Sequence, residues 1–307
     1  MTQSTYDPCL LYTSTNGFGV VGLQTDDTLF LADPEFANAE EVKLQKAKFL
    51  AKEREQLTTQ HAIKFNGGQI NLQDNSSIRL TQERQCQNLR LVATQSIDLT
   101  SSRGEIRKAV TPTDQYVAQR ARGAYIATVC QPEAAFDLSF AAQVTDPQND
   151  NIKQLNKRIQ WQMENPTRGL TFVPLDIKSL SLVIFTDASF ANNKDLSSQI
   201  GYVIVLTDRN HSANIIHWLS IKCKPVTRSV LASELYGLAH GFDIGAAIKS
   251  TIQNILQLEQ LPLVLCTDSK SLYDCLVKLG TIQEKRLMVN LMYLRQAYER
   301  REITEIK

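Results

Sequence analysis

Two apolar segments of the sequence each end in an acidic residue, and a third acid lies on the segment between them. VIFTD ends at Asp187 and VLCTD ends at Asp268, while Glu234 lies early in SVLASELYGLAHGF, where leucines recur on neighbouring helical turns. Burying an unpaired carboxylate is costly, so a charged group at the end of a core strand needs an explanation. The plainest explanation is that Asp often begins a turn.

A joint metal site accounts for the three acids better than three separate turns do. In a sheet with helices on its faces, ligands bind at the carboxyl ends of the strands. A helix that lays its leucine face on the sheet can aim Glu234 at two such ends. Three carboxylates without basic partners repel one another unless cations lie between them, and hard oxygen ligands in this number suit Mg²⁺ or Mn²⁺. Two such ions, about 3.5–4 Å apart, are the usual device for displacement at a phosphodiester.

The elements that would position these acids follow in a clear order. The run 182–185 is apolar throughout, which is typical of a strand buried on both faces. Apolar runs and helical periodicity predict strands 180–186, 199–207 and 213–222, a long helix from Ser229, a strand 261–269, helices 270–278 and 283–299, and a last strand in EITEIK. This order predicts an α/β (α+β) fold, with a mixed five-stranded sheet flanked by helices.

The first half of the chain is predicted to contain short strands and a group of helices. Segment 17–33 is typical of two strands around a polar turn that holds Asp26 and Asp27. The remaining predictions are a helix at 36–57, a hairpin at 61–73, a helix at 80–93, a loop or linker at 96–112, helices at 113–130, 133–145 and 149–163, and a turn with a short strand at 165–176.

Composition excludes several classes of protein. The 307 residues are 43% apolar and 21% charged, as in an ordinary soluble globular protein long enough for two domains. No apolar run reaches the length of a membrane span, and the polar start MTQSTYDP is not a signal peptide. The six cysteines include no CxxC pair, and the four histidines lack metal-ligand spacing, so we expect no zinc site. A net charge of +1 is too weak to argue for nucleic-acid binding by itself.

The order FTDASF…ASELYG…CTDSKS resembles the type 1 ribonuclease H domain of copia-type (pseudoviral) LTR retrotransposon polyproteins. LQTDDTLFLAD is similar to the two-Asp palm hairpin of the adjoining reverse transcriptase, and segments 116–143 and 158–172 resemble its thumb and connection. The resemblance implies a partial palm and thumb at 1–110, a helical thumb or connection segment at 111–176, and an RNase H-like domain at 177–307 that is truncated at its C-terminus.

This resemblance implies a metal-dependent nuclease that hydrolyses the RNA strand of RNA–DNA hybrids with two Mg²⁺ or Mn²⁺ ions. Asp187, Glu234 and Asp268 match three members of the four-acid metal cluster of the family. The residues expected to contact nucleic acid are Ser269 and the backbone groups around Ser233–Glu234 for the 2′-hydroxyl, and Lys222, Lys224 and Arg228 for phosphates. For these basic residues an ordinary solvated loop is an equally good interpretation. Discrimination of RNA from DNA requires a contact to the 2′-hydroxyl.

Asp26 and Asp27 would be a polymerase remnant, because a third catalytic Asp and the fingers belong upstream of them in the family. We therefore expect no polymerase activity from this chain. Other fragments of the polyprotein are possible partners, and we expect an intracellular location, in a cytoplasmic particle or the nucleus, with no membrane and no secretion.

Three alternatives stand beside this interpretation. The first is a catalytically inactive, nucleic-acid-binding transposon remnant, because the fourth acid of the family would follow the fifth strand. The second is a transposase or integrase, but these order their acids D, D, E, and the order here is D, E, D. The third is an aspartyl-phosphate phosphatase, which would need an acid where Ser189 stands.

Overall fold

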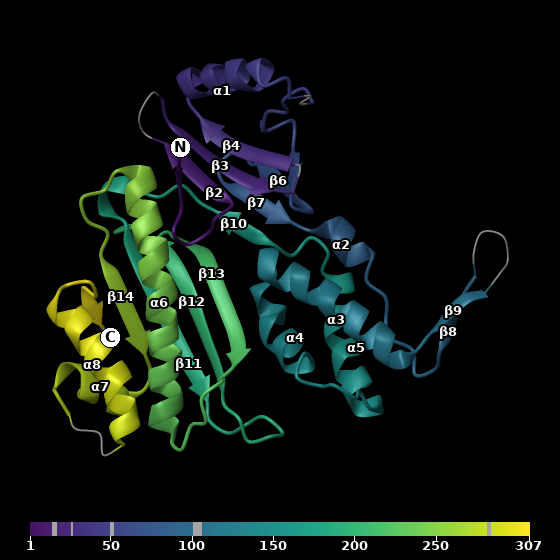
Figure 1. The fold of residues 1–307 in the computed structure, drawn as a ribbon, viewed down its shortest axis with the longest axis vertical. Coiled ribbons are helices and arrows are strands. Elements are labelled where there is room, and N and C mark those ends of the chain that lie inside the picture. The colour runs from purple at the N-terminus through teal and green to yellow at the C-terminus, as the bar shows by residue number, and fades with distance from the viewer. Residues whose placement is uncertain (14–16, 26, 50–51, 101–105, 281–283) are drawn as a thin grey trace.

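The computed structural model describes residues 1–13, 17–25, 27–49, 52–100, 106–280 and 284–307. For residues 98–100 and 106–108 it gives the backbone but not the side chains. The described strands form four sheets, with the orders β1-β2-β3-β4, β10-β7-β6-β5, β8-β9 and β13-β12-β11-β14-β15. In Figure 1 the largest sheet, with helix α6 across it, lies beside a group of helices and below the two four-stranded sheets.

The N-terminal sheet is an antiparallel meander covered by one helix. Its elements are β1 (Thr2–Gln3), β2 (Leu10–Thr13), β3 (Gly19–Gln24), β4 (Asp27–Ala32) and α1 (Pro34–Lys46). The predicted pair of strands at 17–33 is confirmed. The predicted helix at 36–57 is wrong in its second half. Asp33 caps the start of α1 by accepting a hydrogen bond from the Phe36 N–H, and the helix stops before Lys48, whose φ of 56° is left-handed.

The second sheet contains the predicted hairpin. Its strands are β5 (Ile63–Phe65), β6 (Gly68–Leu72), β7 (Ile78–Thr81) and β10 (Leu170–Phe172). Asn66 and Gly67 both have positive φ, as a two-residue hairpin turn requires. The predicted helix at 80–93 shrinks to α2 (Glu83–Gln87), because 78–81 pair as a strand instead. The predicted loop at 96–112 is also wrong, since β8 (Ile97–Thr100) and β9 (Ile106–Val110) form a hairpin.

The three helices predicted at 113–163 are confirmed and pack on one another. They are α3 (Pro112–Val129), α4 (Ala135–Ala141), preceded by the 3-10 turn η1 (Pro132–Ala134), and α5 (Asn149–Glu164). Thr111 and Asp114 form a capping box at the start of α3, with Pro112 at its first position. Tyr116, Ile126, Leu138 and Ile159 lie in a core that is separate from the core of the largest sheet.

The largest sheet is mixed and has five strands, as predicted. After the 3-10 turn η2 (Ile177–Ser179), its elements are β11 (Ser181–Ser189), β12 (Gln199–Thr207), β13 (Ala213–Lys222), α6 (Val230–Leu256), β14 (Leu263–Thr267), α7 (Lys270–Val277), the 3-10 turn η3 (Lys285–Leu287), α8 (Met288–Glu299) and β15 (Glu305–Ile306). The first three strands are antiparallel neighbours, whereas β14 is parallel to β11 and β15 is parallel to β14.

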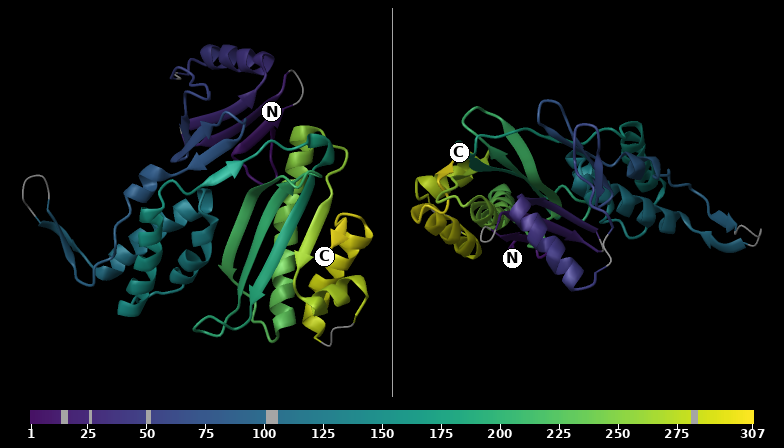
Figure 2. Two further views of the ribbon diagram at one scale, coloured as in Figure 1. Left: turned by 180° about the vertical axis from the view of Figure 1, so that it is seen from behind. Right: turned by 90° about the horizontal axis from the view of Figure 1, so that it is seen from above.

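Strand β11 is buried on one face only, so the prediction of a strand buried on both faces is wrong. Leu182 and Ile184 are fully buried under α6, but Phe185, on the opposite face, is 51% exposed. Figure 2 shows the reason, since no helix lies over the centre of the other face in the view from behind. Gly245 lets α6 approach the strand closely, because a Cβ there would lie 2.1 Å from Ile184 Cδ1.

Several hydrogen bonds join the largest sheet to the rest of the chain. Trp218 Nε1 on β13 donates to the Ala127 carbonyl of α3 at 2.9 Å, and Gln199 Nε2 on β12 donates to Ser139 Oγ of α4 at 3.1 Å. The proposed boundary between 176 and 177 falls between β10 and η2 and stays a prediction. In the part of the chain that the structure describes, no helix is both long and apolar enough to cross a membrane.

Candidate functional site

The parallel register of β11 and β14 brings two acids to the same edge of the sheet. Thr186 lies opposite Thr267, so Asp187 and Asp268 follow directly after paired residues. Asp187 does not end its strand as predicted, because β11 continues to Ser189. Both carboxylates are exposed. The sheet therefore presents two acids side by side, facing solvent.

Helix α6 carries the third acid, Glu234, to the place where Asp187 and Asp268 lie. The helix begins at Val230, after Ser229 Oγ accepts a hydrogen bond from the Ala232 N–H at 3.2 Å. Glu234 is in its second turn and is only 5% exposed. Its Oε2 is buried and has no hydrogen-bond partner in the described structure. A buried carboxylate oxygen without a partner is uncommon, which suggests that a ligand normally satisfies it.

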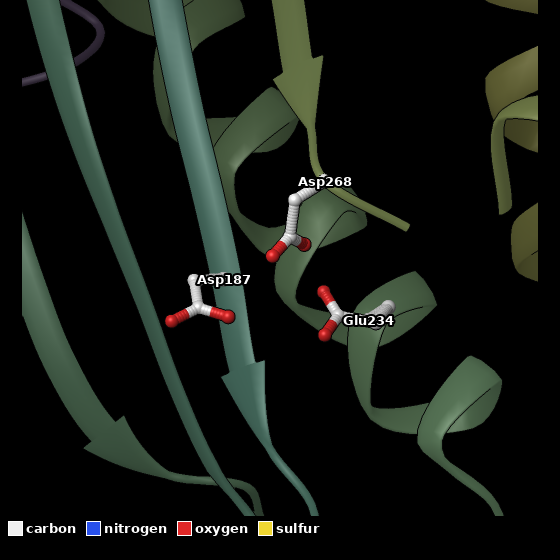
Figure 3. A group of neighbouring side chains, drawn as sticks. All are labelled: Asp187, Glu234 and Asp268. Atoms are coloured by element: carbon white, nitrogen blue, oxygen red, sulfur yellow. The ribbon is translucent and has the colours of Figure 1, made fainter. Parts of the chain in front are cut away.

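The three acids converge, as Figure 3 shows. Asp187, Glu234 and Asp268 each offer a carboxylate oxygen within 4.8 Å of the other two. None of them joins an ion pair with another described residue. A cluster of three hard oxygen donors with an unpartnered buried oxygen fits a divalent cation of the Mg²⁺ or Mn²⁺ type.

Electrostatics within the cluster act mainly on Glu234. Burial is the largest cause that raises the pKa of its carboxyl, and the charges of Asp187 and then Asp268 raise it further, to about 7. The nearby backbone N–H of Ala188 acts in the opposite direction. Sequence analysis missed this donor, because a backbone group leaves no signal in the residue type. The cation-free cluster therefore binds a proton at a higher pH than a free glutamate does.

The basic residues proposed for phosphate contacts have different surroundings. Lys222, at the end of β13, pairs with Asp195 of the β11–β12 connection, so its charge is already compensated. Lys224 and Arg228 are exposed and form no ion pair with another described residue. Of the three, these two remain free to contact an anionic ligand.

The two serines also differ. The Ser233 side chain is fully buried, and its Oγ donates to the Val230 carbonyl at 2.7 Å, so this side chain does not face a ligand. A helical serine commonly bonds back to the preceding turn in this way. The expected contact from backbone groups around Ser233–Glu234 stays a prediction. Ser269 is half-buried beside Asp268, and its Oγ caps α7 by accepting from the Leu272 N–H at 3.3 Å. Its hydroxyl proton can still be donated.

Of the predicted polymerase remnant, the structure describes one residue only. Asp26 lies outside the described residues. Asp27 is exposed at the start of β4, opposite Gln24. Within the described ranges, the Asp187, Glu234 and Asp268 group is the only cluster of three potential metal ligands.

Comparisons with known proteins give structural similarity without sequence similarity. No family model and no curated protein sequence matches the chain. Ribonuclease H1 LC11, isolated from compost, is similar at 16% identity over 41% of this chain and 81% of its own, with a TM-score of 0.30, and one of its structures holds an RNA/DNA hybrid. The N-terminal RNase H domain of rv2228c from Mycobacterium tuberculosis is similar at 19% identity over 42% of this chain and 80% of that one, with a TM-score of 0.29.

A longer similarity covers nearly the whole chain. A foamy viral protease–reverse transcriptase, solved in complex with double-stranded DNA, is similar at 13% identity over 94% of this chain and 46% of its own, with a TM-score of 0.47. The chain therefore spans about half the length of that viral protein. At these identities and scores the similarity carries no argument about function, which is argued from the site.

Proposed function

We propose that the chain is a metal-dependent nuclease that hydrolyses the RNA strand of RNA–DNA hybrids. The observation that carries this proposal is the convergence of Asp187, Glu234 and Asp268 within 4.8 Å, with Glu234 Oε2 buried and unpartnered. These residues would hold Mg²⁺ or Mn²⁺, and two ions are expected. Ions bound there would lower the pKa of a water and balance the negative charge on the scissile phosphate.

Each acid contributes differently to the site. The exposed carboxylates of Asp187 and Asp268 face the side from which a nucleic acid can approach. Glu234 is buried on the side of the cluster that faces away from solvent, and its carboxyl must lose its proton to act as a ligand. Because its pKa is about 7, affinity for cations rises as the pH rises through neutrality.

Substrate recognition would come from groups around this cluster. Ser269, beside Asp268, is our candidate for the contact to the 2′-hydroxyl that distinguishes RNA from DNA. Lys224 and Arg228, both exposed and unpaired, are our candidates for phosphate contacts. The RNA–DNA hybrid as substrate and the copia-type retrotransposon origin rest on the sequence resemblance of FTDASF, ASELYG and CTDSKS.

The same resemblance supports the division into a partial palm at 1–110, a thumb or connection at 111–176 and a nuclease domain at 177–307, together with an intracellular location. It also supports the absence of polymerase activity from this chain. The domain division, the location and the lack of polymerase activity are parts of the same proposal.

A cleavage assay tests the proposal. Residues 1–307 are incubated with an RNA–DNA hybrid that is labelled on the RNA strand, in Mn²⁺ or in Mg²⁺. We expect cleavage of the RNA strand and faster cleavage in Mn²⁺, because Mg²⁺ demands near-ideal octahedral geometry and the described cluster supplies three carboxylates. The matched controls are single-stranded RNA and double-stranded DNA of the same sequence, which should stay intact.

Binding of the hybrid without cleavage in either metal would refute the enzyme and favour the inactive, nucleic-acid-binding remnant. Equal cleavage of the hybrid and of single-stranded RNA would refute the proposed substrate.

A further inference from the structure

The N-terminal segment is held on the domain of the largest sheet by side-chain contacts that do not include the three acids. Ser4 Oγ lies 2.8 Å from Thr251 Oγ1 of α6, and both residues are buried. Tyr6 OH lies 2.9 Å from His217 Nδ1 of β13. We call these four residues the N-terminal latch. The segment approaches the upper end of α6 in Figure 1.

His217 is the centre of the latch. Its second ring nitrogen, Nε2, lies 3.3 Å from Tyr202 OH on β12, and the two rings stack with centroids 5.7 Å apart. The Tyr6 ring meets the imidazole edge-on. A neutral imidazole offers one donor and one acceptor nitrogen, and a tyrosine hydroxyl can serve either, so all these groups are satisfied when His217 is uncharged.

Among the described residues, no carboxylate lies within ion-pair distance of the His217 imidazole, so a positive charge there would have no direct partner. The titratable groups that face the imidazole are Tyr6 and Asp7 of the N-terminal segment, Tyr202 of β12 and His240 of α6, whose Nδ1 is buried and unpartnered in the described structure. Asp7 accepts a hydrogen bond from the Cys9 N–H instead.

Other charged residues on the neighbouring elements are engaged elsewhere. Asp243 of α6 accepts a hydrogen bond from Tyr293 OH, and Lys249 donates to the Glu302 carbonyl. Asp137 of α4 pairs with Arg158. Strand β10, which packs beside β13, carries no titratable side chain.

We propose that the N-terminal latch is acid-sensitive: the neutral His217 imidazole holds the N-terminal segment against α6 and β13, and protonation of the imidazole releases it. The latch thus couples the N-terminal sheet to the domain that carries the acid cluster in a pH-dependent way. This inference does not depend on the proposed nuclease activity.

The direction of the pH dependence follows from the burial of the imidazole. Burial is the first cause that lowers the pKa of His217, and the neighbouring His240 is the second. A base whose pKa is lower when docked than when free stabilises the docked state fully above its ordinary value of about 6.5. That stabilisation is lost as the pH falls from there through the lower pKa of the docked imidazole.

Hydrogen exchange of the full chain tests the latch. The Ser4 N–H donates to the Leu10 carbonyl and the Tyr6 N–H donates to Ser4 Oγ, both within the segment. Contact with Thr251 of α6 buries Ser4 and holds its Oγ in place, so both amides should be better protected while the latch is closed. After correction for the intrinsic exchange rate, we expect their protection to fall about fivefold between pH 8 and pH 5, the change that corresponds to one hydrogen bond. Amides of the central strand β11 should keep their protection, which distinguishes release from unfolding.

Two variants make the test specific. His217→Gln keeps a donor and an acceptor but cannot be protonated in this range, so protection of Ser4 and Tyr6 should become independent of pH. His211→Gln, in an exposed turn, is the matched control and should respond like the wild type. An unchanged pH response in His217→Gln, or no response in the wild type, would overturn the proposal.

A direct titration covers the case in which His217→Gln does not fold. Nuclear magnetic resonance of the wild-type His217 ring should give a pKa below the ordinary value. A pKa at or above it would overturn the proposal.

Discussion

Glu234→Gln is expected to abolish cleavage of the RNA strand and, at the same time, to raise the melting temperature of the metal-free protein at pH 8. The activity is lost because an amide removes one of three anionic ligands from the cluster. The stability rises because the amide has no charge to bury beside Asp187 and Asp268. One substitution thus separates the function of the cluster from its contribution to stability.

The sign of the stability change follows from the raised pKa. A carboxyl whose pKa is about 7 when folded, against 4.5 for the free side chain, binds more protons in the folded state over that range. The stability that this proton uptake gives the folded state is complete below pH 4.5 and is lost as the pH rises through 7. The full shift would be worth about 3 kcal/mol, and solvent screening at the exposed neighbours reduces this to about 1–2 kcal/mol.

Thermal unfolding in a chelator, at pH 5 and pH 8, measures this effect. The melting temperatures of the wild type and Glu234→Gln should be similar at pH 5 and diverge at pH 8. Glu299→Gln, at an exposed site on α8, is the control and should follow the wild type at both pH values. A Glu234→Gln protein that is less stable than the wild type at pH 8 would contradict the interpretation that Glu234 is a buried, uncompensated acid.

Phe242→Ala is expected to lower the free energy of unfolding by about 3–5 kcal/mol, more than the other substitutions proposed for this chain, because it leaves a cavity in the core beneath the sheet. Phe242 is 1% exposed on α6, and its ring lies 5.5 Å from that of Tyr293 on α8. It therefore joins the helix that carries Glu234 to a second helix of the same domain. Metal affinity should fall with stability, since the position of α6 sets the position of Glu234.

Thermal unfolding with and without Mn²⁺ checks this prediction. Phe136→Ala, on α4, is the matched control, because its ring is 51% exposed and its loss should cost about 1 kcal/mol or less. Equal losses from the two substitutions would contradict the assignment of Phe242 to the core that holds α6.

The fold of 177–307 could be predicted because its sequence pattern is strong. Apolar runs mark β11, β12 and β14, and the long periodic segment after Ser229 marks α6. Where the sequence pattern is weaker, the predicted secondary structure is partly wrong. Segment 36–57 is periodic throughout, but the helix stops after Lys46. Segment 96–112 has the polar composition of a loop, yet the backbone of its described residues pairs as a hairpin.

The acids could be predicted because two apolar runs of the same pattern, VIFTD and VLCTD, each lead into an Asp, whereas the contacts of their neighbours could not. Ser233 precedes Glu234 in the chain, but a step of one residue along a helix turns the side chain by about 100°, and this one lies buried against its own helix. The contact between Tyr6 and His217 joins residues 211 positions apart, and no local pattern predicts such a pair.

The most direct measurement of the central claim is the anomalous scattering of Mn²⁺ in crystals of the protein. We expect at least one peak within about 2.0–2.6 Å of a carboxylate oxygen from each of Asp187, Glu234 and Asp268. The peak should disappear in crystals of Glu234→Gln that are soaked in the same way. Saturating Mn²⁺ that leaves the three carboxylates in place with no peak between them, or that binds only elsewhere, would contradict the account.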